Sequence, residues 1–348
     1  MKKGIIALLI VLVILVGGCL AFYFVSTGPV NKGDHGIVVV KLEQGSGTAS
    51  IAATLEDQGL IKNSFVFRVK SKLSGNDGKY KAGSFAIKKS MSMGEIMDLI
   101  ISGKTVGKTF VIPEANTVEK NSVLLQSKNI VDAKDFLNEV ANGDFDYKFI
   151  KGLPKGTSRL EGFLYPDQYQ VSLEADAHEI INVMLKQFNN VFTDEYYAKA
   201  KKMDMSVLEV MTVASIIEKE AKTKEDKLKV SSVIYNRLKD DMPLQMDSIL
   251  AYIHKEDKIK ASLADTQVES DYNPYKNKGL PPGPICSPGM GSIYAALNPA
   301  DTDYIYFVAG EKLDGTNVFS VTYEDFLKDK AKFDKAYKEY IKKHPDKV

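Results

Sequence analysis

The chain has 348 residues, of which 44% are hydrophobic and 26% charged, a composition that suits folded domains. Its 46 basic and 45 acidic side chains leave a formal net charge of +1, so charge gives no reason to expect a nucleic-acid partner. The two cysteines and four histidines have no metal-ligand spacing and do not suggest a Ser-His-Asp triad. We therefore expect no metal and no other cofactor.

An uncharged apolar run over residues 4–25 directly follows Lys2 and Lys3. About 20 apolar residues at ~1.5 Å each span a ~30 Å hydrocarbon core, and a signal-peptide core is only ~7–15 residues long. We predict a single transmembrane helix over 4–25, with residues 1–3 in the cytoplasm and the remainder outside the cell membrane. Cys19 follows two glycines and loosely matches a lipoprotein cleavage box, so a lipid anchor is the alternative.

A polar, glycine-rich segment over 26–35 is typical of a linker and is followed by a small α+β domain over 36–105. The strands expected there are 36–42 and 79–87, and the expected helices are 50–61, 64–73 and 91–100. This order resembles LysM modules, which bind glycans that contain N-acetylglucosamine. A domain that only spaces the rest of the chain from the membrane fits the pattern as well.

The rest of the chain divides into a connecting region, 106–152, and a larger mixed α+β domain, 153–343, before a short tail, 344–348. The connecting region has a strand pattern at 108–112 and helical patterns over 116–146. Composition shifts to glycine, proline and aromatic residues from Leu153 onwards. The helices expected in the larger domain are 174–192, 206–222, 225–239, 288–297 and 323–343. The predicted fold class is therefore α+β.

The helix expected over 206–222 holds the candidate acid. Ser206 and Glu209 have capping-box spacing at its start, and Glu218 and Glu220 lie on the two flanks between a polar and an apolar face. The polar face is expected to carry Thr212, Ser215, Lys219 and Lys222. Partial desolvation raises the pKa of a carboxyl, and a glycosidase needs such a protonated acid. The pattern does not choose between the two glutamates, and ordinary boundary carboxylates paired with lysines remain the alternative.

Five ordered motifs resemble those of the YceG-like family, the endolytic murein transglycosylases called MltG. They are 161–167 (EGFLYPD), 214–221 (ASIIEKEA), 233–238 (VIYNRL), 243–248 (PLQMDS) and 270–275 (SDYNPY) with 279–285 (GLPPGPI). The resemblance implies a peptidoglycan lytic transglycosylase that cuts the β-1,4 bond between N-acetylmuramic acid and N-acetylglucosamine and leaves 1,6-anhydro ends. It places the catalytic glutamate at Glu218, as general acid and then general base. It also implies glycan strands as the substrate, nascent strands that end where they are cut, and peptidoglycan synthases as partners.

The other motifs supply candidate substrate contacts. Polar side chains suited to sugar hydroxyls and amides, rings suited to stacking and cleft-lining carboxyls are Gln245, Asp247, Asn236, Tyr235, Tyr275, Glu161 and Glu220. Helix capping by Asn236 or Asp247 is the structural alternative. Two other functions stay open. A glycan-binding scaffold would not need Glu218, whereas a hydrolytic muramidase would need a second carboxylate from Glu161, Asp247 or Glu220.

Overall fold

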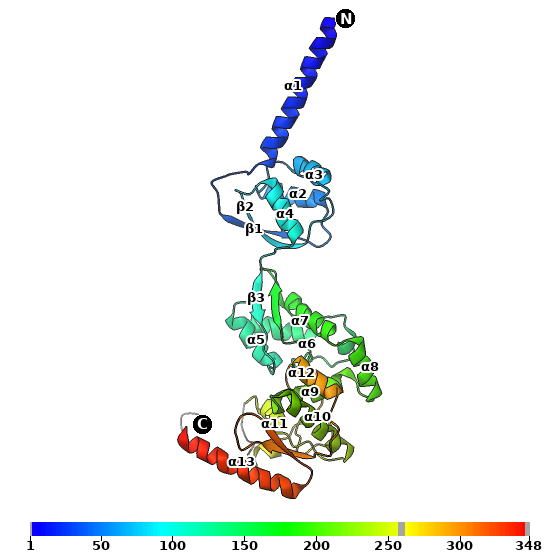
Figure 1. Ribbon diagram of the computed structural model, residues 1–348, viewed down its shortest axis with the longest axis vertical. Helices are drawn as coiled ribbons and strands as arrows, with labels where there is room; N and C mark the ends of the chain where they lie inside the picture. The colour runs from blue at the N-terminus through cyan, green and yellow to red at the C-terminus, as the bar shows by residue number, and fades with distance from the viewer. Residues whose placement is uncertain (1, 257–261, 345–348) are drawn as a thin grey trace. The chain divides into compact units, whose positions relative to one another are not determined.

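The computed structural model describes residues 2–256 and 262–344 (Figure 1). The chain folds as two compact units, Met1–Lys108 with Gln170–Glu174, and Thr109–Tyr169 with Ala175–Val348. Helices and short two-stranded sheets alternate along it, which confirms the predicted α+β class. The finer division at residues 105 and 152 stays a prediction. Met1 and most of the predicted tail, 345–348, lie outside the described residues.

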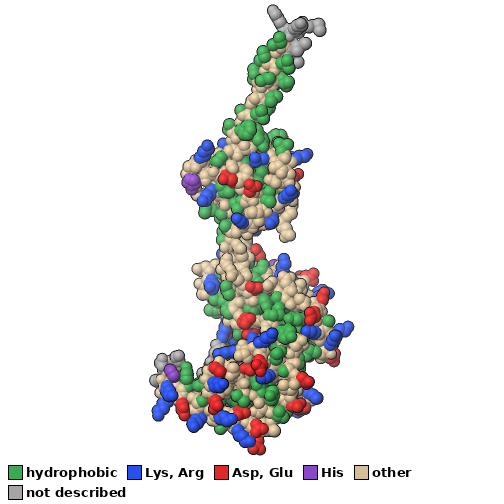
Figure 2. All heavy atoms as spheres, in the orientation of Figure 1, with side chains coloured by type: hydrophobic (Ala, Val, Ile, Leu, Met, Phe, Trp, Pro, Cys, Tyr) green, Lys and Arg blue, Asp and Glu red, His purple; other side chains and the backbone are tan. Residues whose placement is uncertain are grey.

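The apolar N-terminal run forms α1 (Lys2–Thr27). Its segment Leu9–Thr27 has a mean hydropathy of 2.7 and is only 6% buried, and Figure 2 shows hydrophobic side chains along its surface. The helix is long and apolar enough to cross a membrane, and a signal sequence would have the same properties. Its last turns belong to the first unit, because Tyr23 packs on that unit's core and Lys62 Nζ donates to the Val25 carbonyl at 2.8 Å. Membrane crossing and orientation stay predictions.

A β-α-α-β arrangement forms the rest of the first unit. Its elements are β1 (Ile37–Leu42), α2 (Thr48–Asp57), α3 (Ser64–Leu73), β2 (Gly83–Lys88) and α4 (Met93–Ser102). The strands β1 and β2 pair antiparallel with the buried side chains of Val40 and Phe85 opposite each other, and the helices pack beside them (Figure 1). Helix α2 ends before the predicted residue 61 because Gly59 adopts a φ of 64°, a left-handed conformation that stops a helix.

Short strands and helices follow along the chain, all in the second unit except Lys108 and Gln170–Val171. The elements are β3 (Lys108–Val111), α5 (Val118–Ser127), α6 (Ala133–Asn142), β4 (Gln168–Val171), α7 (Ala177–Val191) and α8 (Asp194–Lys202). Strands β3 and β4 pair with each other. Phe188 of α7 packs against Phe149 and Phe163 with ring centroids 4.6 and 5.3 Å away, and all three rings are buried. The three rings form an aromatic core in this part of the second unit.

Helix α9 (Val207–Glu220) is the centre of the second unit. It packs against α10 (Lys224–Lys239), α11 (Asp247–His254) and α12 (Met290–Leu297), as Figure 1 shows. The predicted polar face of this helix is wrong for its central turns, because Thr212 is 1% and Ser215 is 0% exposed. Both hydroxyls donate to carbonyls of their own helix, to Leu208 and Thr212 respectively, so they can be buried without an unpaired polar group.

A hairpin and a long helix close the chain. Strands β5 (Tyr306–Ala309) and β6 (Asn317–Ser320) pair antiparallel, and α13 (Tyr323–Lys343) packs on them through a stack of Tyr306 on Phe326, 5.4 Å between centroids. Among its described residues α13 has none that is buried. The remaining helices at 177–191, 224–239 and 290–297 also lie within a few residues of their predicted ranges.

Candidate active site

Glu218 lies on the last turn of α9, and its side chain is only 7% exposed. Its carboxylate accepts hydrogen bonds from three donor groups of the described residues. Lys227 Nζ donates at 3.1 Å to Oε2 and 3.2 Å to Oε1, Ser292 Oγ donates to Oε2 at 2.6 Å, and the Gly289 amide donates at 3.1 Å. The helical pattern predicts an acid at the edge of an apolar stripe. The structure instead surrounds this carboxylate with donors.

The donors come from α10 and α12, two helices that pack against α9. Lys227 lies in the first turn of α10, whose N-cap Thr223 accepts from the Asp226 amide and fixes where the helix begins. Gly289 is the N-cap of α12, so the positive end of that helix faces Glu218. Lys227 is 11% exposed at its side chain, so the ion pair is largely shielded from water.

A second carboxyl, Glu114, lies in hydrogen-bonding contact with Glu218. It comes from the segment between β3 and α5, where the Ala115 amide donates to the Ser287 carbonyl at 2.9 Å and the Ser287 amide donates to Asn116 at 2.8 Å. Burial of this carboxyl and the negative charge of Glu218 raise the pKa of Glu114, although the residue as a whole is exposed. Gly289 makes the approach possible, because a Cβ there would lie 1.8 Å from Glu114 Oε1.

Glu220, on the other flank of α9, faces a different set of groups. Burial raises the pKa of Glu220, against the effect of a hydrogen bond from the backbone amide of Ser248 in α11. The nearby charge of Asp247 raises it further. Asp247 in turn accepts from the Tyr275 hydroxyl at 2.7 Å. The structure thus brings together Glu220, Asp247 and Tyr275 of the predicted substrate contacts.

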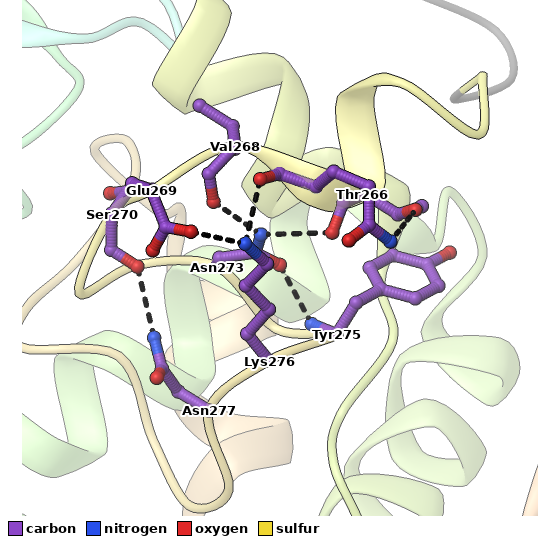
Figure 3. Close-up of polar contacts among 9 residues, drawn as sticks. Thr266, Val268, Glu269, Ser270, Asn273, Tyr275, Lys276 and Asn277 are labelled. Atoms are coloured by element: carbon purple, nitrogen blue, oxygen red, sulfur yellow. Dashed lines mark hydrogen bonds and ion pairs between the residues drawn. The ribbon is translucent and has the colours of Figure 1, made fainter.

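A hydrogen-bonded loop presents Tyr275 (Figure 3). Asn273 is fully buried, and its Nδ2 donates to the carbonyls of Thr266 at 3.1 Å and Val268 at 2.7 Å, while its Oδ1 accepts from the Tyr275 amide at 2.9 Å. The same loop holds the backbone of Gln245, whose backbone amide donates to the Pro274 carbonyl at 3.0 Å. The side chain of Gln245 is exposed and its backbone has a φ of 48°.

The other predicted contacts have partners within the protein. Both oxygens of Glu161 accept from the Val118 amide, at 3.1 and 3.2 Å, which satisfies the first turn of α5, and burial raises the pKa of Glu161 to about 8. Tyr235 donates from its hydroxyl to the Ala296 carbonyl at 2.7 Å. Asn236 Nδ2 donates to the carbonyls of Thr302 and Tyr304, at 2.8 and 2.9 Å. A direct role in substrate binding stays a prediction for these three.

Sequence reasoning missed Glu114, Lys227 and Ser292. Glu114 follows a proline in the predicted connecting region and belongs to no periodic pattern. Lys227 lies in the charged stretch 224–229, which is typical of a solvated helix face. Ser292 lies in a run rich in glycine and small residues that has no feature of a binding site. The only local signal was the charge of Lys227 near the two glutamates.

The model of the YceG-like family matches residues 40–332. The chain belongs to the YceG-like family. It is 32% identical over 333 residues to the endolytic murein transglycosylase of Bacillus subtilis, with 92% of this chain and 91% of that protein covered. The endolytic murein transglycosylase of Streptococcus pneumoniae D39 is 32% identical over 338 residues, 88% of this chain and 61% of that longer protein. A crystal structure of a yceG-like protein from Listeria monocytogenes is 33% identical, with a TM-score of 0.56 over 84% of this chain and 99% of that one. The family predicted from the five motifs is thereby confirmed.

Proposed function

We propose that this YceG-like protein is an endolytic peptidoglycan lytic transglycosylase with Glu218 as its acid and base. The two curated relatives carry the name endolytic murein transglycosylase. The observation that carries the proposal is the environment of Glu218. Its carboxyl lies on the last turn of α9, is nearly buried, and accepts hydrogen bonds from Lys227, Ser292 and the start of α12. Nearly buried charged groups that meet at one point are typical of catalytic sites.

The reaction needs a single carboxyl that works twice. Glu218 donates a proton to the glycosidic oxygen between N-acetylmuramic acid and N-acetylglucosamine, and then accepts the proton of the muramic 6-hydroxyl as that oxygen attacks C1. The C1–O4 bond breaks, the C1–O6 bond forms, and the proton count of the enzyme is unchanged. Because the nucleophile is on the same sugar, no water has to be activated. Lys227 stabilises the carboxylate between the two steps.

The position of the second carboxyl favours this scheme over a hydrolytic muramidase. Two-carboxylate glycosidases place their carboxyls about 5–5.5 Å or about 6.5–9.5 Å apart, on either side of the sugar. Glu114 is in hydrogen-bonding contact with Glu218, which leaves no room for a sugar ring between them. Glu161, one of the three carboxyls that the sequence offered a hydrolase, is 4% exposed and bonded to the start of α5.

Substrate contacts belong to the same proposal. Gln245 has an exposed side chain on a backbone fixed by Pro274, which suits a hydrogen bond to a sugar amide. Tyr275 and Asp247 are joined to each other, and Glu220 lies near them, so these three would act as one group. Asn236, Tyr235 and Glu161 would support the walls around the glycan through their internal bonds.

The setting in the cell is also a proposal. α1 would hold the protein in the cell membrane as a single-pass anchor, with the second unit on the extracytoplasmic side, where nascent strands are cut and their elongation ends. The β-α-α-β unit would act as a LysM-like module on the glycan, and peptidoglycan synthases would be the partners. A glycan-binding scaffold without activity is the competing function, and it makes Glu218 dispensable.

Mass spectrometry of purified peptidoglycan, digested by the full chain and by its Glu218→Gln variant, tests the proposal. We expect 1,6-anhydromuramic ends from the first and none from the second, while thermal unfolding of the two proteins stays alike. Reducing ends would place the protein among hydrolases. The absence of products from both would favour the scaffold, and full activity of the Glu218→Gln variant would remove Glu218 from the mechanism.

A further inference from the structure

The hydrogen bonds around Glu218 create a difficulty for an acid catalyst. Lys227, Ser292 and the Gly289 amide all donate to this carboxylate, and each such bond favours its ionised form. A general acid has to carry a proton when the substrate binds. The described part of the chain therefore has to supply a group that returns a proton to Glu218 in spite of these donors.

Glu114 is placed to do this. Its carboxyl is in hydrogen-bonding contact with Glu218, and the two residues that follow it, Ala115 and Asn116, are bonded through their backbone to Ser287. Gly289, whose amide donates to Glu218, leaves the space that the Glu114 carboxyl occupies. The other titratable groups that face the pair are Lys227 from α10, the Tyr165 hydroxyl beside Glu114, and the buried Cys286 thiol near Glu218.

Two carboxyls in contact bind one proton more tightly than either would alone, because ionising both places like charges against each other. Lys227 compensates one negative charge at 3.1 Å and cannot compensate two equally. The Glu114 carboxyl then donates to the Glu218 carboxylate. The raised pKa of Glu114 agrees with this arrangement.

We propose that Glu114 and Glu218 share a single proton and that Glu114 is the positioning residue that keeps it available to Glu218. The inference rests on the proposed transglycosylase function. During the reaction the shared proton passes from Glu114 to Glu218 as Glu218 protonates the glycosidic oxygen. The proton of the muramic 6-hydroxyl then returns to the pair when the C1–O6 bond forms, so the enzyme ends with the proton count with which it began.

The pH dependence of the Glu114→Gln variant tests the role in catalysis. Without the second carboxyl, Glu218 has no neighbouring carboxyl with which to share a proton. We expect the basic limb of the kcat profile to move down by about one pH unit or more, with a loss of about tenfold at about pH 7.5 and less than about threefold at about pH 5. The KM should change little. Glu311→Gln, an exposed carboxyl of the same unit, is the control and should match the wild type. An equal loss at every pH, or none, would overturn the inference.

A measurement that needs no turnover separates this inference from the proposed function. Infrared difference spectroscopy of the full chain at about pH 7 counts protonated carboxyls by their C=O stretch. We expect Glu114→Gln, Glu218→Gln and the double variant each to lose the same single band, because the two residues hold one proton. Retention of the band in either single variant, or loss of two bands in the double variant, would refute proton sharing. If the wild type shared the proton but released no anhydro ends, only the proposed function would fail.

Discussion

Replacing Lys227 by methionine removes the cation from Glu218 while keeping the length of the side chain. The two partners are 11% and 7% exposed at their side chains, and the Nζ to Oε2 distance is 3.1 Å. In the variant, the Glu218 carboxylate keeps the Ser292 hydroxyl and the Gly289 amide but loses its only charged donor among the described contacts. We expect a clear loss of stability, because a nearly buried charge is left without its counter-ion.

The size of the loss follows from burial rather than from distance. Removing one partner of a fully buried ion pair costs about 3–5 kcal/mol. The two remaining donors and the possibility of protonating the carboxyl reduce this, so we expect about 2–3 kcal/mol at about pH 8. The loss shrinks as the pH falls, because a proton can replace the missing cation. Lys229 and Glu225, also on α10, form a shorter pair of 2.6 Å, yet at 30% and 77% exposure it should contribute only about 0–1 kcal/mol.

Thermal unfolding of the detergent-solubilised full chain, followed by circular dichroism, measures the difference. In a domain of about 150–250 residues, 1 kcal/mol shifts Tm by about 2–4 °C, so Lys227→Met should lower it by about 4–12 °C at about pH 8. Lys229→Met, the matched control, should lower it by less than about 4 °C. If both variants shift Tm equally, or if the effect of Lys227→Met grows towards acid pH, the pair is not the buried ion pair described above.

Three further outcomes are expected. Gly289→Ala should lower the free energy of unfolding by less than about 1 kcal/mol, because the φ of −79° at this position is ordinary and the Glu114 side chain can rotate away. In the same activity assay this variant should reproduce the pH profile of Glu114→Gln. Glu161 is protonated when folded below its raised pKa of about 8 and ionises near its ordinary pKa when unfolded, so wild-type stability should fall from about pH 5 to about pH 8. For Glu161→Gln, the free energy of unfolding measured by chemical denaturation should depend less on pH over that range, and a steeper fall would contradict the assignment. Asn273→Ala should lower the free energy of unfolding by about 1–3 kcal/mol and expose residues 262–277 to proteolysis. Asn277→Ala is the control, because the Asn277 side-chain amide donates to an exposed carbonyl, and it should leave the cleavage pattern unchanged.

Local chemistry explains which helices the sequence could predict. The capping box of Ser206 and Glu209 forms as expected, with Ser206 Oγ accepting from the Glu209 amide at 3.2 Å and Glu209 accepting from the Ser206 amide at 2.8 Å. The end of α9 was less predictable, because Ala221 turns to an extended conformation, with a φ of −138°, one residue before the expected limit. That end matters for function, since it leaves both glutamates on the final turn.

The periodicity of α9 does not predict which of its side chains are buried. A hydroxyl on a helix predicts a solvated face only if it needs water, and Thr212 and Ser215 instead donate to carbonyls of the helix itself. Ser215 also accepts from the Ile285 amide at 3.0 Å, a contact that joins residues 70 positions apart. The candidate site also depends on a long-range contact, because Ser292 donates to Glu218 although the two are 74 residues apart in the sequence. The periodicity of a single helix does not predict such a contact.

The helical pattern left Glu218 and Glu220 undecided, and their environments now distinguish them in physical terms. Each accepts from the start of a short helix, Glu218 from the amide that precedes α12 and Glu220 from Ser248 in the first turn of α11. Capping of this kind needs only an acceptor, so it gives both residues a structural reason to be glutamates. Glu218 alone of the two also has a buried lysine and a second carboxyl in contact, groups that allow a proton to leave and return at little cost. A carboxyl that acts first as an acid and then as a base requires that reversibility, which supports the proposal that Glu218 rather than Glu220 carries the chemistry.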